Sequence, residues 1–221
     1  MRLSIVGATG GVGRCLLEQA VDAEHAVTAI VRDPRRLTRQ IRTVTVDLSA
    51  PDPEIVRAAV MGSDAVLSGL GARTSADHGV VERGTRALIE AMRASGVRRI
   101  VVVSAAPIGT VDSPGRPHPP RHDPGDGLVM RYVGSPLVKR AFAASYADLA
   151  RMEDALRESD LEWTAVRPPR LTDGALTGRY RTAYGRNLRR GLSISRADVA
   201  HLMLRLVERP EAVGQTVGIA R

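Results

Sequence analysis

Residues 3–13 read Leu-Ser-Ile-Val-Gly-Ala-Thr-Gly-Gly-Val-Gly. The apolar run Leu3–Val6 predicts a buried strand, and an apolar-periodic segment after the glycines predicts a helix. The glycines stand at the spacing G-x-x-G-x-x-G, at Gly7, Gly10 and Gly13. Glycine permits a tight turn and a close backbone approach, while the helix N-terminus attracts phosphate. This stretch therefore predicts a Rossmann-type α/β fold that binds a dinucleotide.

Strands and helices alternate along the rest of the chain. Strands are expected at Leu3–Val6, Ala26–Val31, Val44–Val46, Ala65–Leu67, Ile100–Val103 and Thr164–Val166. Helices are expected at Gly11–Val21, Pro53–Met61, Val80–Ser95, Tyr146–Ser159 and Ala197–Val207. The strands read as continuous apolar runs, which is typical of strands buried on both faces. The alternation predicts one doubly wound parallel sheet in a single NAD(P)-binding domain over residues 1–221.

Residues 105–135 interrupt this alternation. They contain five glycines and several prolines, namely Pro107, Pro114, Pro117, Pro119, Pro120 and Pro124. Such a composition prevents a long helix or an inner strand. The segment leaves the carboxyl end of the fifth expected strand, where ligands bind in open α/β sheets. We therefore expect a substrate-side lid loop, with a passive insertion as the alternative.

The composition excludes several other classes of protein. The net charge is +8, almost entirely from scattered arginines, and aromatic residues make up 3% of the chain, so we expect no nucleic-acid partner. No apolar run is long enough to span a membrane. Cys15 is the only cysteine and no signal peptide precedes the first strand, which favours a cytoplasmic protein. His118 and His122 lack further spaced ligands, so no metal site is expected.

The end of the second expected strand distinguishes between cofactors. A carboxylate there favours NADH, because it accepts a hydrogen bond from the ribose 2′-hydroxyl, whereas an arginine accommodates the 2′-phosphate of NADPH. Arg32 occupies this strand end, and Arg35 follows it closely. Asp33 would repel a phosphate, but Asp33-Pro34 also forms a natural turn. The sequence therefore favours NADPH over NADH.

Further candidate cofactor contacts lie in the glycine turn and after neighbouring strands. Asp47 is placed to accept a hydrogen bond from the adenine amino group, and Gly69-Leu70-Gly71 lets the backbone pass close to a ribose. A plain turn is the alternative for both. The predicted cofactor-binding residues are Gly7, Thr9, Gly10, Gly11, Val12, Gly13, Arg32, Arg35, Asp47, Leu48, Gly69, Leu70, Gly71 and Ser104.

Over nearly its whole length the chain resembles the atypical short-chain dehydrogenases. Within them it is similar to the NAD(P)H-binding group that contains the NmrA-like proteins and the flavin/biliverdin reductase B type. The resemblance rests on Gly7–Gly13, Val31–Asp33, Val46–Leu48, Val101–Ala105, Arg151–Ser159, Arg167–Pro169, Leu176–Gly178 and Ile194–Ala200. It implies a Rossmann fold with strand order 3-2-1-4-5-6-7 and NADPH as the usual cofactor.

The acid/base residues that this resemblance implies are incomplete. Typical short-chain dehydrogenases use a Tyr-x-x-x-Lys pair, whereas Ala150 stands four residues after Tyr146 and Lys139 lies seven residues before it. The flavin/biliverdin reductase type implies a histidine and a serine where this chain has Leu149 and Ala105. Neither known set of proton-transfer groups is therefore complete.

Two hydroxyl side chains remain as catalytic candidates, Ser104 after the fifth strand and Tyr146, whose phenol can donate without ionising. Arg170 is placed to attract an anionic substrate, with a surface arginine as the alternative. The predicted substrate contacts are Ala105, Pro107, Tyr146 and Arg170.

Hydride transfer to a flavin or quinone survives the loss of an acid/base pair, because such acceptors take their proton from water. We therefore predict a monomeric or homodimeric NADPH-dependent oxidoreductase of a small flavin-, quinone- or carbonyl-like acceptor. An NmrA-like NADP(H) sensor without catalysis is the alternative.

Overall fold

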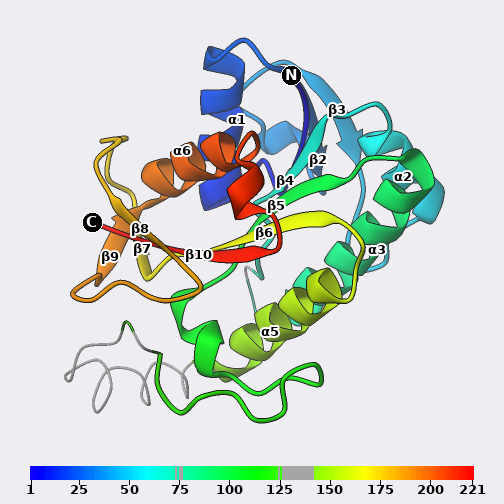
Figure 1. The fold of residues 1–221 in the computed structure, drawn as a ribbon. Coiled ribbons are helices and arrows are strands. Elements are labelled where there is room, and N and C mark those ends of the chain that lie inside the picture. The colour runs from blue at the N-terminus through cyan, green and yellow to red at the C-terminus, as the bar shows by residue number, and fades with distance from the viewer. Residues whose placement is uncertain (73, 75–76, 124, 126–141) are drawn as a thin grey trace.

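An eight-stranded sheet forms the centre of the molecule (Figure 1). The computed structural model describes residues 1–72, 74, 77–123, 125 and 142–221. The strand order is β3-β2-β1-β4-β5-β6-β10-β8. The strands are β1 (Arg2–Val6), β2 (Ala26–Val31), β3 (Arg42–Thr45), β4 (Ala65–Ser68), β5 (Arg99–Val103), β6 (Glu162–Arg167), β8 (Arg181–Tyr184) and β10 (Gln215–Ala220).

The predicted order is confirmed for the seven strands that run across the sheet from β3 to β10, and each of these pairs in parallel with its neighbours. The predicted parallel sheet carries one further strand that was not predicted, because β8 adds an antiparallel edge strand against β10. Its sequence, Arg-Thr-Ala-Tyr, is largely exposed and lacks the apolar run by which the inner strands were predicted.

Helices cover both faces of the sheet (Figure 1). Helices α1 (Gly11–Asp22) and α6 (Arg196–Leu206) pack on one face, where they share a core with Leu3 and Ile5 of β1. The opposite face carries α2 (Pro53–Val60), α3 (Val80–Ser95) and α5 (Ala143–Arg157), whose core includes Val6 of β1. Strand β1 thus contributes side chains to both cores, as expected for a central parallel strand. In the described part of the chain, no helix has the length and apolarity that crossing a membrane requires.

Local sequence sets several helix ends. Pro53 opens α2 behind Asp52, whose carboxylate accepts hydrogen bonds from the N–H groups of Glu54 and Ile55. Gly96 ends α3 with a φ of 72°, the left-handed conformation that favours glycine at this position. Ser195 caps α6, because its hydroxyl accepts a hydrogen bond from the N–H of Asp198 at 3.0 Å.

Two short segments were not predicted. Strands β7 (Arg170–Thr172) and β9 (Ser193–Ser195) form a separate two-stranded parallel sheet. Three residues are too few to establish a hydrophobic period. The expected loop 105–135 begins with a 3₁₀ helix, Ala106–Thr110, in which Ile108 is fully buried. The part of this loop at residues 124 and 126–135 lies outside the described residues.

Candidate functional site

The glycine turn is shaped by close backbone contacts between β1, α1 and β4. Gly7 has a φ of 69°, a left-handed conformation that β-carbon-bearing residues rarely adopt. A Cβ added to Gly13 would lie 2.0 Å from the carbonyl oxygen of Gly7. A Cβ added to Gly69 would lie 2.8 Å from the N–H nitrogen of Gly13. Side chains at these positions would force the three elements apart.

The N-terminus of α1 has unused hydrogen-bond donors. Gly10 is its N-cap and supplies no side chain, and the first turn contains no acidic residue. The first helical bond runs from the Arg14 N–H to the Gly10 carbonyl oxygen at 2.9 Å. Within the described residues, the N–H groups of Gly11, Val12 and Gly13 have no hydrogen-bond partner. These donors and the positive end of the helix dipole are suited to a phosphate.

A trough runs from this turn across the carboxyl ends of neighbouring strands. It brings together most of the predicted cofactor residues, namely Gly7, Thr9, Gly10, Arg32, Asp47, Leu48, Gly69, Leu70 and Gly71. Gly11, Val12 and Gly13 belong to the adjoining first turn of α1. Asp77 and Val80 also line the trough, although sequence reasoning did not select them. They come from the segment before α3 and its first residue, which lack a distinctive pattern.

Arg32 and Arg35 lie in different surroundings. Arg32 lines the trough, and its Nη1 lies 3.0 Å from Oδ1 of Asp77, with about half of its side chain exposed. Arg35 does not line the trough, because its guanidinium pairs with Asp33. The Asp33 carboxylate also accepts the Arg35 N–H at 3.1 Å. The Arg35 hydrogen bond lowers the pKa of Asp33, so the carboxylate is charged but compensated within its own turn.

Asp47 presents a charged carboxylate to the trough. Its Oδ1 accepts the N–H of Ser49 at 2.9 Å, and this backbone hydrogen bond is the main reason that the pKa of Asp47 is lowered. Hydrogen bonding to Ser49 also fixes the orientation of the carboxylate. An oriented acceptor at this strand end suits a hydrogen bond from an amino group.

A second cavity of about 560 Å³ opens beside the carboxyl ends of β5 and β6. All four predicted substrate contacts, Ala105, Pro107, Tyr146 and Arg170, line it. Sequence reasoning missed much of the opposite wall, because it is formed by the irregular segment between β8 and β9, including Asn187, Leu188, Arg190 and Leu192. Among the described lining residues there are four arginines and no acidic side chain.

Tyr146 places a phenol at this cavity from the first turn of α5. Burial raises the pKa of Tyr146 above its ordinary value of 10.0. The phenol is therefore protonated at neutral pH and can donate a hydrogen bond. Its ring lies 5.9 Å from that of Phe142, which forms part of the same cavity wall.

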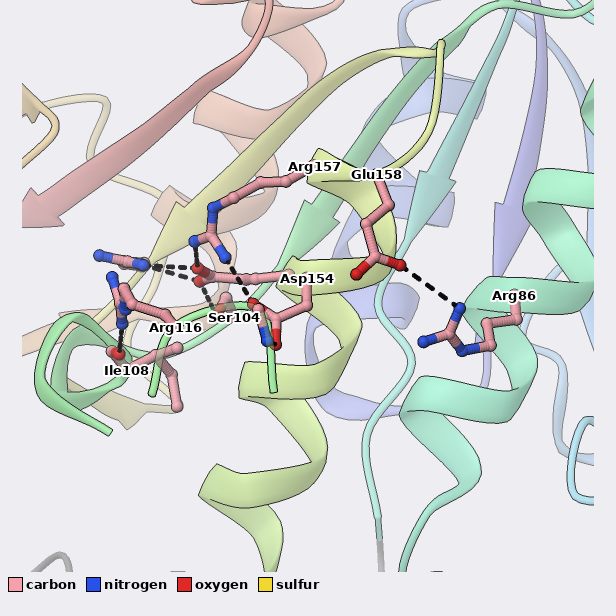
Figure 2. A network of polar contacts seen from close by, with 10 residues as sticks. Arg86, Ser104, Ile108, Arg116, Asp154, Arg157 and Glu158 are labelled. Atoms are coloured by element: carbon pink, nitrogen blue, oxygen red, sulfur yellow. Dashed lines mark hydrogen bonds and ion pairs between the residues drawn. The ribbon is translucent and has the colours of Figure 1, made fainter. Parts of the chain in front are cut away.

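Ser104 belongs instead to a buried charge network, part of which is labelled in Figure 2. Its hydroxyl donates to Oε1 of Glu153 at 2.7 Å, and Arg167 Nε donates to the same oxygen at 2.8 Å. Arg157 also pairs with Glu153. Burial raises the pKa of Glu153, but the hydrogen bonds and charges of its partners outweigh that effect and leave the pKa lowered.

This geometry bears on the predicted catalytic role of Ser104. The side chain is buried and lines neither the trough nor the cavity. Its hydroxyl proton is directed to Glu153, so it is not directed to an acceptor in the cavity. The structure therefore brings Tyr146, and not Ser104, into the predicted substrate site.

Comparisons with known proteins agree with this arrangement. A family model described as NAD(P)H-binding matches residues 7–210. The Bacillus subtilis protein YwnB is 27% identical, over 96% of this chain and 94% of its own. A Streptomyces 3-diazoavenalumate denitrifying reductase is 32% identical, over 84% of this chain and 57% of its own. The structure of ChuY, an anaerobillin reductase from Escherichia coli O157:H7, superposes with a TM-score of 0.76 at 24% identity, covering 100% of this chain and 97% of that one.

The family match begins at the glycine turn and extends beyond α6. It therefore includes the turn, the strand ends that form the trough and most of the residues that line the cavity, whereas Gly218, Ile219 and Ala220 lie beyond it. Together with the parallel sheet, it shows that this chain belongs to the NAD(P)H-binding family and has a Rossmann fold, as the sequence resemblance predicted.

Proposed function

We propose that this protein is an NADPH-dependent oxidoreductase that reduces a small organic acceptor with a flavin-, quinone- or carbonyl-like group. The observation that carries the proposal is that two cavities lie close together at the N-terminus of α1. Gly10 lines the trough, while Arg196, whose side chain lies against Gly11, lines the 560 Å³ cavity. A dinucleotide in the trough would thus extend its reactive ring toward a separate acceptor site.

The trough residues fit NADPH. The free N–H groups of α1 suit its pyrophosphate, and the Asp47 carboxylate suits its adenine amino group. Arg32 would bind the 2′-phosphate in exchange for Asp77. Such a half-exposed ion pair contributes only about 0–1 kcal/mol, so a doubly charged phosphate can replace it. Arg35 lies outside this set while it pairs with Asp33.

The cavity suits an acceptor that has a planar, apolar ring and a negatively charged substituent. Its wall includes the rings and alkyl groups of Pro107, Phe142 and Leu192. The charge of Arg167 is compensated by Glu153. Arg170 and Arg190, by contrast, make no ion pair within the described chain. The name of the Streptomyces relative, a diazoavenalumate reductase, supports reduction of a small organic molecule.

Bound NADPH supplies a hydride, and the reduced acceptor takes up one proton. Tyr146 can provide that proton, because burial keeps its phenol protonated beside the acceptor. Its conjugate phenolate would be costly, since position 150 holds alanine and not the lysine that stabilises such an anion. We therefore favour flavin- or quinone-like acceptors, which also accept their proton from water.

The proposal is tested in two steps. Titration with NADPH is expected to quench the fluorescence of Trp163 or enhance that of the cofactor, and absence of binding would overturn the proposal. NADPH oxidation is then screened with flavins, quinones and carbonyl compounds. Turnover with one class supports the oxidoreductase. Tight binding with no turnover in the whole screen would favour the NmrA-like sensor, for which the missing acid/base pair is the supporting observation.

A further inference from the structure

Arg196 lies between the trough and the cavity. It is the first residue of α6 and lines the 560 Å³ cavity. Its side chain crosses to the start of α1, where a Cβ added to Gly11 would lie 2.5 Å from the Arg196 Nε and 2.6 Å from its Cδ. The guanidinium therefore lies against the first turn of α1, where the N–H groups of Gly11, Val12 and Gly13 have no partner in the described part of the chain.

The backbone around Arg196 is held firmly in place. Ser195 and Asp198 form the N-terminal cap of α6, and Asp198 also accepts the N–H groups of Thr177 and Gly178 at 2.9 Å. Gln19 of α1 donates to the Ala197 carbonyl oxygen at 2.9 Å, which joins the two helices. Figure 1 shows α1 and α6 side by side on one face of the sheet.

Arg196 makes only a weak ion pair. Its Nη1 lies 2.6 Å from Oδ1 of Asp173, but the Asp173 side chain is 88% exposed. An exposed carboxylate retains most of its hydration, so this ion pair adds little stability. No acidic residue in the first turn of α1 competes for the guanidinium.

We propose that Arg196 binds the pyrophosphate of the dinucleotide by leaving Asp173 and adding its N–H donors to those of α1. This inference rests on the proposed cofactor site. A guanidinium presents a planar fork of donors that matches phosphate oxygens. Arg32 then distinguishes NADPH from NADH through the 2′-phosphate, whereas Arg196 binds a group that both cofactors share.

Gly11 supports this assignment. It is helical and exposed, and it has no positive φ that would require glycine. Outside the backbone of α1, the three atoms nearest to a Cβ added there all belong to the side chain of Arg196. Glycine at position 11 therefore provides the space through which Arg196 reaches α1.

Three ligands separate the roles of the two arginines, namely NADPH, NADH and adenosine 2′-monophosphate, which lacks a pyrophosphate. Arg196→Ala is expected to weaken NADPH and NADH by the same factor, about tenfold to a hundredfold, and to leave the 2′-monophosphate unchanged. The matched variant Arg32→Ala is expected to weaken NADPH and the 2′-monophosphate and to spare NADH. Unchanged NADPH binding in Arg196→Ala, or an equal loss of the 2′-monophosphate, would contradict the inference.

Two further variants keep the test independent of folding. Asp173→Asn removes the competing carboxylate and is expected to tighten NADPH and NADH equally, so weaker binding would overturn the inference. Gly11→Ala is expected to weaken NADPH in the wild-type background and to have little effect in Arg196→Ala. Additive losses would show that the two residues act separately. If the wild-type protein binds neither cofactor, the proposed function itself fails, which distinguishes the two failures.

Discussion

At the scale of single residues, two hydroxyl groups that look equivalent in the sequence have different surroundings. Tyr146 is half-buried at the cavity and stays protonated because burial raises its pKa. Ser104 is buried, and its hydroxyl donates a hydrogen bond to Glu153. A proton donor must reach the acceptor, so the phenol is the better candidate.

Replacement of Tyr146 separates acceptors that need an acid from those that do not. Tyr146→Phe is expected to lower kcat for a carbonyl acceptor by about a hundredfold, the lower end of general acid catalysis, and to leave a quinone acceptor almost unchanged. The measurement is steady-state NADPH oxidation, with the NADPH Kd as the control for an intact cofactor site. Equal losses with both acceptors would contradict the proposed role.

The same residue predicts the pH dependence of carbonyl reduction. The pKa of Tyr146 is raised above 10.0, so the donating form persists to higher pH than a free phenol would allow. We expect turnover to be flat from about pH 6 to pH 9 and to fall only in more alkaline solution. A loss of activity centred near neutral pH would assign proton transfer to another group.

At the scale of elements, a buried ion network joins β5, β6 and α5. Glu153 of α5 accepts hydrogen bonds from Ser104 at the end of β5 and from Arg167 at the end of β6. Asp154 extends the network to the loop after β5, because it accepts the Gly115 N–H at 2.9 Å. The network thereby supports the cavity wall that includes Arg167.

Removal of the Glu153 charge tests this support. Glu153→Gln leaves the buried Arg167 without its carboxylate partner, although Arg157 retains Asp154, and is expected to lower the free energy of unfolding by about 3–5 kcal/mol. The matched control is Glu158→Gln at the C-terminal cap of the same helix. The exposed Glu158 carboxylate lies 3.9 Å from Arg86 (Figure 2), and its loss is expected to change stability by less than about 0.5 kcal/mol. Denaturant unfolding measures both, and similar losses would contradict the structural role.

The lowered pKa of Glu153 also predicts acid sensitivity. Its stabilising effect is present above the unfolded-state pKa, near 4.5, and is lost as pH falls through the lower folded-state value. The wild-type protein should therefore lose stability below about pH 4.5 more steeply than Glu153→Gln. Parallel stability–pH curves would show that other carboxylates control acid unfolding.

At the scale of the whole molecule, the sheet aligns strand ends from distant parts of the chain. The ends of strands β1, β2 and β4 contribute residues to the trough. The ends of β5 and β6 and the segment after β8 contribute residues to the cavity. Ligand binding to this shared edge is therefore expected to stabilise the complete fold.

Cofactor binding should raise the unfolding temperature. A ligand at about 100 times its Kd adds roughly 2.7 kcal/mol, which corresponds to a shift of about 5–10 °C for a chain of this size. At equal concentrations NADPH should shift the midpoint more than NADH, and Arg32→Ala should remove the difference. Differential scanning fluorimetry measures both, and equal shifts in the wild-type protein would contradict a role of Arg32 in cofactor choice.

Much of the fold and of the cofactor trough was predictable because it depends on local signals. The apolar runs, the glycine turn and the position of Arg32 are contiguous in the chain, and the order of the parallel strands followed from the family resemblance. Strand β8 was missed because its residues are largely exposed, and β7 and β9 because each contains three residues.

The sequence by itself determined the Rossmann fold and the dinucleotide turn, because spacing and backbone freedom act between neighbouring residues. Only the tertiary structure decided which side chains meet. It directed Ser104 to Glu153 and placed Arg196 against Gly11. Contacts between Arg196 and Gly11 or between Ser104 and Glu153 depend on packing of distant elements, and no local pattern encodes that packing. The direction of a polar side chain therefore follows from its partners in space.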